Sequence, residues 1–165
     1  AAKLADAGMR VISEALAELS QTRDREGAQL NALMTQRLDG MNEIVTRVRA
    51  VLPEIVQSFR ARLEARLADI RDQLDPARLE QEVVLFAQKT DVDEELDRLT
   101  THITETRRVL GDKGQVGRRL DFLMQELNRE ANTLGSKASD LRLTNAAVDL
   151  KVLIEQMREQ VQNIE

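Results

Sequence analysis

The stretch GRRLDFLMQELNREANTLGSK, residues 117–137, decides the fold, because its apolar residues return every three or four positions. This spacing predicts a helix that turns one apolar side towards a core. Its polar side carries three amides, and two of them are asparagines, which favour a helix less strongly than glutamate or lysine would. These amides are Gln125, Asn128 and Asn132. They indicate a buried polar contact, a cap, or a face that binds a ligand.

The composition extends this helical prediction to the whole chain. Of its 165 residues, 42% are hydrophobic and 32% are charged, and only two are prolines. No stretch alternates apolar and polar residues for long enough to indicate a strand. The chain has no cysteine, which excludes disulfides and thiolate metal sites. We therefore predict an all-α protein.

The hydropathy pattern bears on the location of the protein. No run approaches the ~18 apolar residues that span a bilayer, and the N-terminus lacks a signal-peptide pattern. A helix lying on a membrane surface would need a basic face with bulky aromatic residues. The net charge of −5 and the absence of Trp disfavour that class. We expect a cytoplasmic protein with no membrane partner.

Apolar residues at helical spacing predict how the chain is organised. They run from Leu30 to Leu74, which indicates a long helix or a pair that bends or restarts near Pro53. In the last helix they step alternately by four and three, as in a coiled coil. We predict one continuous, elongated domain with coiled-coil-like packing. It would consist of an antiparallel helical arm or hairpin over residues 1–74 and a compact helical bundle over residues 75–165.

The charges are sorted along the chain. Residues 91–97, DVDEELD, carry five carboxylates and no cation, whereas residues 107–119, RRVLGDKGQVGRR, carry five cations and one aspartate. Carboxylates that hold a divalent metal beside arginines that hold phosphates would give this pattern. The alternative is helix-end electrostatics, because acidic residues favour a helix start and basic residues a helix end.

The short connection at residues 111–114 makes helices 91–110 and 116–134 antiparallel neighbours. Facing residues should then have numbers that add to roughly 225, which places Glu95 level with Glu130. The polar edges of the two helices carry carboxylates, amides, arginines and the one histidine, His102. If both edges open on the same side, these groups converge on one groove.

Three separated motifs, DVDEELDRLTTHI, GRRLDFLMQELNREANTLGSK and the terminal DLKVLIEQMREQVQNIE, together resemble the C-terminal portion of the YicC/YloC family of bacterial endoribonucleases. The upstream REGAQL and FRARLEARL are similar to the helical middle of that family. The resemblance implies a metal-dependent ribonuclease that cuts single strands and forms a homo-oligomer, a hexamer in the full-length family protein. Family members begin with an α/β domain that this chain lacks, so we expect the isolated chain to be weakly active or inactive.

Phosphodiester hydrolysis requires an activated nucleophile and stabilisation of the charge that develops on the phosphate, and divalent ions held by carboxylates can supply both. We assign a site for Mn or Mg to Asp91, Glu95 and Glu130. The predicted catalytic residues are His102, Arg98 and Glu126. The predicted RNA-binding residues are Arg118, Arg119, Gln125, Asn128, Arg129, Asn132 and Lys137.

Structural salt bridges and a solvated helix surface are the competing interpretation of these charges. The alternative function is a non-catalytic helical module for oligomerisation or RNA binding. Such a module would also show the heptad pattern. It would leave the asparagine-rich edge of residues 117–137 unexplained.

Overall fold

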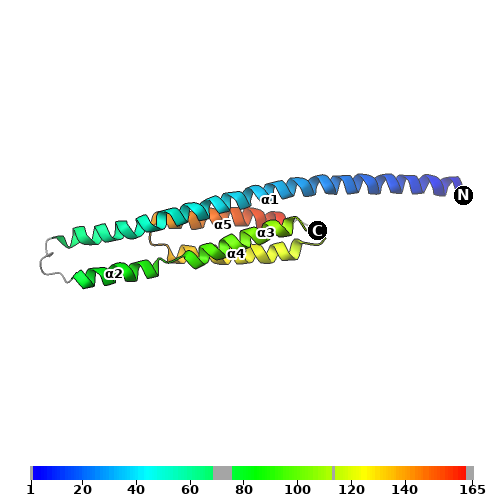
Figure 1. The fold of residues 1–165 in the computed structure, drawn as a ribbon. Coiled ribbons are helices and arrows are strands. Elements are labelled where there is room, and N and C mark those ends of the chain that lie inside the picture. The colour runs from blue at the N-terminus through cyan, green and yellow to red at the C-terminus, as the bar shows by residue number, and fades with distance from the viewer. Residues whose placement is uncertain (1, 69–75, 113, 163–165) are drawn as a thin grey trace. The chain divides into compact units, whose positions relative to one another are not determined.

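The structure is a computed structural model that describes residues 2–68, 76–112 and 114–162, with side chains from residue 6 onward. Within these residues the backbone forms α helices and no strand, which confirms the all-α prediction (Figure 1). The helices are α1 (Ala2–Arg66), α2 (Pro76–Lys89), α3 (Asp93–Leu110), α4 (Gly117–Lys137) and α5 (Leu141–Gln162). None of the described helices combines the length and the apolar composition needed to cross a membrane.

The chain divides into two compact units, residues 1–36 and residues 37–165. The first unit contains only α1 residues, and it exposes a set of large apolar side chains. These are Met9, Val11, Ile12, Leu16 and Leu19. The predicted division into an arm of residues 1–74 and a bundle of residues 75–165 remains a prediction.

Within the second unit, α4 packs against both α3 and α5 (Figure 1). Each helix contributes one apolar side to a shared core, as the spacing of the leucines predicts. Side chains that are completely or almost completely buried include Leu38, Met41, Leu96, Leu99, Leu120, Leu127, Leu134, Leu143 and Leu150. This core holds α3 and α4 side by side, and their shared polar edge is the region of functional interest.

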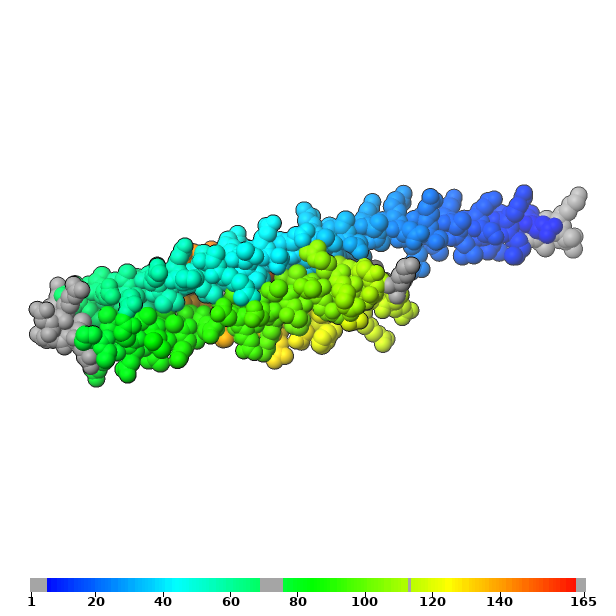
Figure 2. Space-filling view, viewed as in Figure 1, coloured from blue at the N-terminus to red at the C-terminus, as the bar shows by residue number. Residues whose placement is uncertain are grey.

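Residues 37–66 of α1 lie along α2 and α3 (Figure 2). Arg49 Nη2 is 2.6 Å from Asp97 Oδ1 of α3, and the rings of Phe59 and Phe86 of α2 stack with centroids 3.9 Å apart. α1 also lies close to α5 at Gly40, where an added Cβ atom would be 3.4 Å from Leu153 Cδ1. Residues 37–66 of α1 therefore contact α2, α3 and α5.

Of the alternatives predicted for this stretch, the structure shows the long helix, since α1 continues through Pro53 without a restart. Proline cannot donate a backbone hydrogen bond to the carbonyl four residues earlier. Pro53 is exposed, so water can reach that side of the helix and solvate the free carbonyl group. The last part of the predicted apolar stripe, up to Leu74, lies outside the described residues.

The start of α3 and its connection to α4 fix the geometry of the polar edge. The N-cap position of α3 is Val92, and just before it Asp91 Oδ1 accepts a hydrogen bond from the Asp93 backbone N–H at 3.1 Å. The connection at residues 111–116 contains Gly114, whose φ of 125° lies in a region that favours glycine. After this connection α4 runs antiparallel to α3, as predicted.

Candidate functional site

A row of polar side chains runs along the boundary between α3 and α4, and we call it the α3/α4 seam. Its members recur at helical spacing on each helix, which keeps them on one side. On α3 they are Glu95, Arg98, His102 and Glu105, and on α4 they are Arg119, Glu126, Glu130 and Lys137. The core leucines lie behind them.

At the end of the seam far from the connection, Glu95 and Lys137 form an ion pair. Lys137 Nζ donates to both carboxylate oxygens of Glu95 at 3.0 and 3.1 Å, and to the backbone oxygen of Asp91 at 3.0 Å. The Glu95 side chain is only 9% exposed. A buried carboxylate is costly without a partner, so Lys137 stabilises Glu95 in the folded protein.

At the end next to the connection, Glu105 accepts hydrogen bonds from two arginines. Arg108 donates from Nε at 2.9 Å and from Nη2 at 2.8 Å, and Arg119 donates from Nη2 at 2.5 Å. The hydrogen bond from Arg108 is the main reason why the pKa of Glu105 falls from 4.5 to about 2, against the opposing effect of partial burial. This end of the seam therefore has no excess of negative charge.

The centre of the seam differs from both ends. His102, Glu126 and Glu130 each offer one nitrogen or oxygen atom, and these three atoms lie within 4.8 Å of one another. Glu130 is almost fully buried, with 4% of its side chain exposed, whereas His102 and Glu126 are half-buried. Among the described residues, no side chain forms a hydrogen bond or ion pair with the Glu126 carboxylate.

Arg98 is the cation at the centre, and two carboxylates share it. Its Nη1 atom lies 3.5 Å from Glu130 Oε1, and its Nη2 atom donates to Glu94 Oε1 at 2.5 Å. The pKa of Arg98 is raised, mainly by the hydrogen bond to Glu94 and also by the charge of Glu130. The centre thus holds two carboxylates, Glu126 and Glu130, and only part of one compensating charge.

The residues at the centre suit a divalent cation. Ligands of a small ion stand about 2.1 Å from it, so atoms already within 4.8 Å of one another need only small side-chain rotations. A set of one imidazole and two carboxylates suits Mn²⁺, because Mg²⁺ strongly prefers oxygen ligands. A cation would also balance the charge of the buried Glu130.

The structure groups the predicted site residues differently from the sequence analysis. Of the predicted metal ligands, Asp91 accepts a hydrogen bond from the Asp93 backbone N–H, and Glu95 is paired with Lys137. Glu130 lies with His102 and Glu126. The sequence pattern places Glu95 level with Glu130, but the carboxylate of Glu95 is bound by Lys137, seven residues further along α4. Arg119 and Glu105, whose numbers add to 224, do pair as that numbering predicts. The connection between α3 and α4 extends to residue 116, and long side chains reach along the helices. Small differences in the register of the two helices therefore change which side chains meet across the seam.

The predicted RNA-binding residues fall into two groups. Gln125 donates to Asp121 at 2.9 Å, Arg119 is bound to Glu105, and Lys137 is bound to Glu95. The remaining four are exposed on α4, and their side chains make no hydrogen bond or ion pair within the described part of the chain: Arg118, Asn128, Arg129 and Asn132. The first group supports the helix, and the second is available to a ligand.

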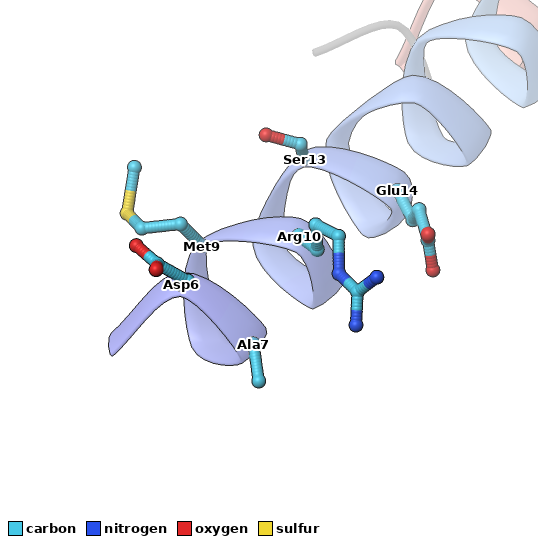
Figure 3. Close-up of a pocket in the computed structure, with 6 residues that line it drawn as sticks. All are labelled: Asp6, Ala7, Met9, Arg10, Ser13 and Glu14. Atoms are coloured by element: carbon cyan, nitrogen blue, oxygen red, sulfur yellow. The ribbon is translucent and has the colours of Figure 1, made fainter. Parts of the chain in front are cut away.

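A shallow surface region near the N-terminal end of α1 offers no competing site. It is lined by Asp6, Ala7, Met9, Arg10, Ser13 and Glu14. All six lining residues belong to α1, and Figure 3 shows their side chains pointing in different directions from this one helix. A single helix surface cannot bury most of a ligand, as binding sites do.

The chain is similar to known proteins over nearly its whole length. Residues 48–165 match the family described as "Endoribonuclease YicC-like, C-terminal", and this range includes every residue of the α3/α4 seam. A "Probable endoribonuclease YicC" of Haemophilus influenzae is 50% identical over 157 residues, which are 95% of this chain and 55% of that protein. A protein of the same description from Clostridioides difficile is 35% identical over 159 residues, 94% of this chain and 54% of that protein. The chain therefore spans about half the length of these relatives.

Proposed function

Because the chain belongs to the family of YicC-like endoribonucleases, to which its residues 48–165 align, we propose that it carries the catalytic part of a metal-dependent endoribonuclease. RNA is the proposed substrate. The observation that supports a catalytic part here is the group of His102, Glu126 and Glu130 at the centre of the α3/α4 seam.

In this proposal His102, Glu126 and Glu130 would hold a divalent ion, Mn²⁺ in preference to Mg²⁺. The bound ion would supply positive charge for the phosphate and lower the pKa of a water molecule. Arg98 stands at the edge of the group, where its guanidinium can contact a phosphate while it remains close to Glu130. Its charge then stabilises the phosphate in the transition state.

The exposed side chains of α4 would bind the RNA strand. Arg118 and Arg129 are exposed cations whose phosphate contacts would fix the strand without reading its sequence. Asn128 and Asn132 offer donors and acceptors to riboses and bases. These two amides belong to the set that made the polar face of residues 117–137 unusual for a helix.

His102 could instead transfer protons directly, and the ends of the RNA products distinguish the two chemistries. Metal-activated water leaves a 5′-phosphate, whereas acid–base catalysis by histidine with the 2′-hydroxyl as nucleophile leaves a 2′,3′-cyclic phosphate. We expect 5′-phosphate ends and complete loss of cleavage with a chelator. Cyclic phosphate ends that form equally well in chelator would contradict the proposal.

This experiment requires a protein of the relatives' length that contains this chain, incubated with a short RNA of defined sequence. The 165-residue chain is the parallel sample, and we expect little or no cleavage by it. Full turnover by the chain alone with Mn²⁺ would show that residues 1–165 contain everything that cleavage needs. We further propose that the protein acts in the cytoplasm as a homo-oligomer, a hexamer at the relatives' length, which light scattering can measure.

A further inference from the structure

The three phenylalanines of the chain, which has no Trp and no Tyr, have different surroundings. Phe59 and Phe86 are half-buried and stack on each other between α1 and α2. Phe122 lies on α4, and 58% of it is exposed. Within the described residues its ring stacks on no other ring. It is thus the aromatic side chain that solvent, or a ligand, can reach.

Phe122 stands beside the centre of the α3/α4 seam. Side chains four residues apart lie on the same side of a helix, and Glu126 follows Phe122 by four residues. The two positions are separated by about 6 Å along the helix axis. An aromatic ring and a carboxylate of the candidate metal site therefore border the same stretch of surface.

Two cations flank the ring. Arg118 lies one turn before Phe122 and Arg129 lies two turns after it, on the adjoining side of α4. Both are exposed, and neither side chain has an ion-pair partner among the described residues. This distinguishes them from Arg119, which is bound to Glu105.

An exposed apolar side chain is common on protein surfaces and by itself indicates nothing. An exposed ring between two unpaired arginines has the chemistry of a single-strand binding surface, where bases stack on aromatic side chains and cations hold the phosphates. We infer that Phe122 stacks on an unpaired base of RNA and so places the neighbouring phosphate at the centre of the seam. This inference rests on the proposed ribonuclease function.

The stacking has a consequence for substrate choice. A base within a duplex has both faces covered by its neighbours, so it cannot lie on the Phe122 ring unless the helix opens. Stacking is also tolerant of sequence, because every base has a π face. Phe122 thus favours single-stranded RNA over double-stranded RNA without selecting a particular base.

The absence of Trp and Tyr gives a direct test with the 165-residue chain. Phe122→Trp creates a single fluorophore at the site, and Leu85→Trp on α2 is the control, since Leu85 is 57% exposed. We expect a short oligoadenylate to quench the emission of the Phe122→Trp protein and to leave that of the Leu85→Trp protein unchanged. An abasic ribose–phosphate strand of equal length should bind without quenching.

Affinity provides the second measurement. We expect Phe122→Leu to raise the Kd for oligoadenylate about tenfold, within the range found when stacking aromatics are removed, and Phe122→Tyr to restore it. Circular dichroism melting of Phe122→Leu should match that of the original chain, because the ring is exposed. Unquenched Trp emission in a saturated complex, unchanged affinity in Phe122→Leu, or no binding of oligoadenylate would each overturn the inference.

Binding of Mn²⁺ to the same samples separates this inference from the proposed function. If Mn²⁺ binds at the seam and the longer protein cleaves RNA while the Trp emission is not quenched, stacking is wrong and the ribonuclease proposal stands. If the emission is quenched while no Mn²⁺ binds and no cleavage occurs, Phe122 belongs to a non-catalytic RNA-binding surface. That result contradicts the placement of a phosphate at a metal site.

Discussion

The ends and the centre of the α3/α4 seam use the same residue types with different charge balance. At the ends, Glu95 is matched by Lys137, and Glu105 is matched by two arginines. At the centre, Glu126 and Glu130 face His102 and share part of Arg98. A carboxylate with a fixed partner stabilises the fold, whereas carboxylates left with excess charge can bind a cation. In this seam, residues that stabilise the fold differ from residues that can bind a cation in their charge balance and not in their residue type.

The largest expected effect concerns cleavage. In a protein of the relatives' length, His102→Ala and Glu126→Gln should each lower the cleavage rate by at least about a hundredfold, because each removes a proposed ligand of the ion that would activate water and bind the phosphate. Oligomer size and helicity should not change. Glu105→Gln, at the end of the seam, is the matched control and should retain most activity. Loss of the oligomer in the first two variants would reassign those residues to structure.

The second prediction concerns the buried pair at the other end of the seam. Lys137→Met leaves the Glu95 carboxylate without its cation, which should lower the free energy of unfolding by about 2–3 kcal/mol. The lower part of this range reflects the partial exposure of Lys137. Urea unfolding followed by circular dichroism measures this change in the free energy of unfolding. Adding Glu95→Gln to Lys137→Met should recover part of the loss, and equal stability of Lys137→Met and the original chain would contradict the structural role.

At the centre, loss of a carboxylate should have the opposite sign. With chelator present, Glu126→Gln should raise the free energy of unfolding by roughly 0.5–1 kcal/mol, because it removes repulsion between Glu126 and Glu130. The same urea experiment measures this change. A marked loss of stability in Glu126→Gln would mean that the carboxylate has a structural partner and that the contrast between centre and ends is false.

The smallest effect is a dependence on pH. The folded-state pKa of Glu105, about 2, lies below its ordinary value of 4.5, so its ionised form is favoured by folding. This contribution is complete above pH 4.5 and is lost as the pH falls from 4.5 towards 2. The stability difference between the original chain and Glu105→Gln should therefore shrink over that interval. A difference that stays constant with pH would show that the arginines do not favour the ionised form.

Much of the fold can be predicted from the sequence, because the spacing of apolar residues along the chain indicates where the helices lie. The apolar period of residues 117–137 predicts α4, and the short connection after Leu110 predicts that α4 returns along α3. These features depend on residues that are near one another in the chain.

The partners across the seam could not be predicted in the same way. Whether Glu95 meets Glu130 or Lys137 depends on the length of the connection and on the reach of long side chains, and neither is fixed by local spacing. The spacing of Glu126 and Glu130 by four residues, opposite the single histidine, was the available signal for the centre. Phe122 was missed because one apolar residue on a polar face does not alter the helical pattern.

The most direct test of the metal site is a Mn²⁺ titration of the 165-residue chain, followed by electron paramagnetic resonance of the free ion. We predict one site per chain that is lost in His102→Ala and in Glu130→Gln and retained in Glu105→Gln. Binding that is equal in all four proteins, or no binding by the original chain, would contradict the claim that the centre of the seam holds a divalent cation.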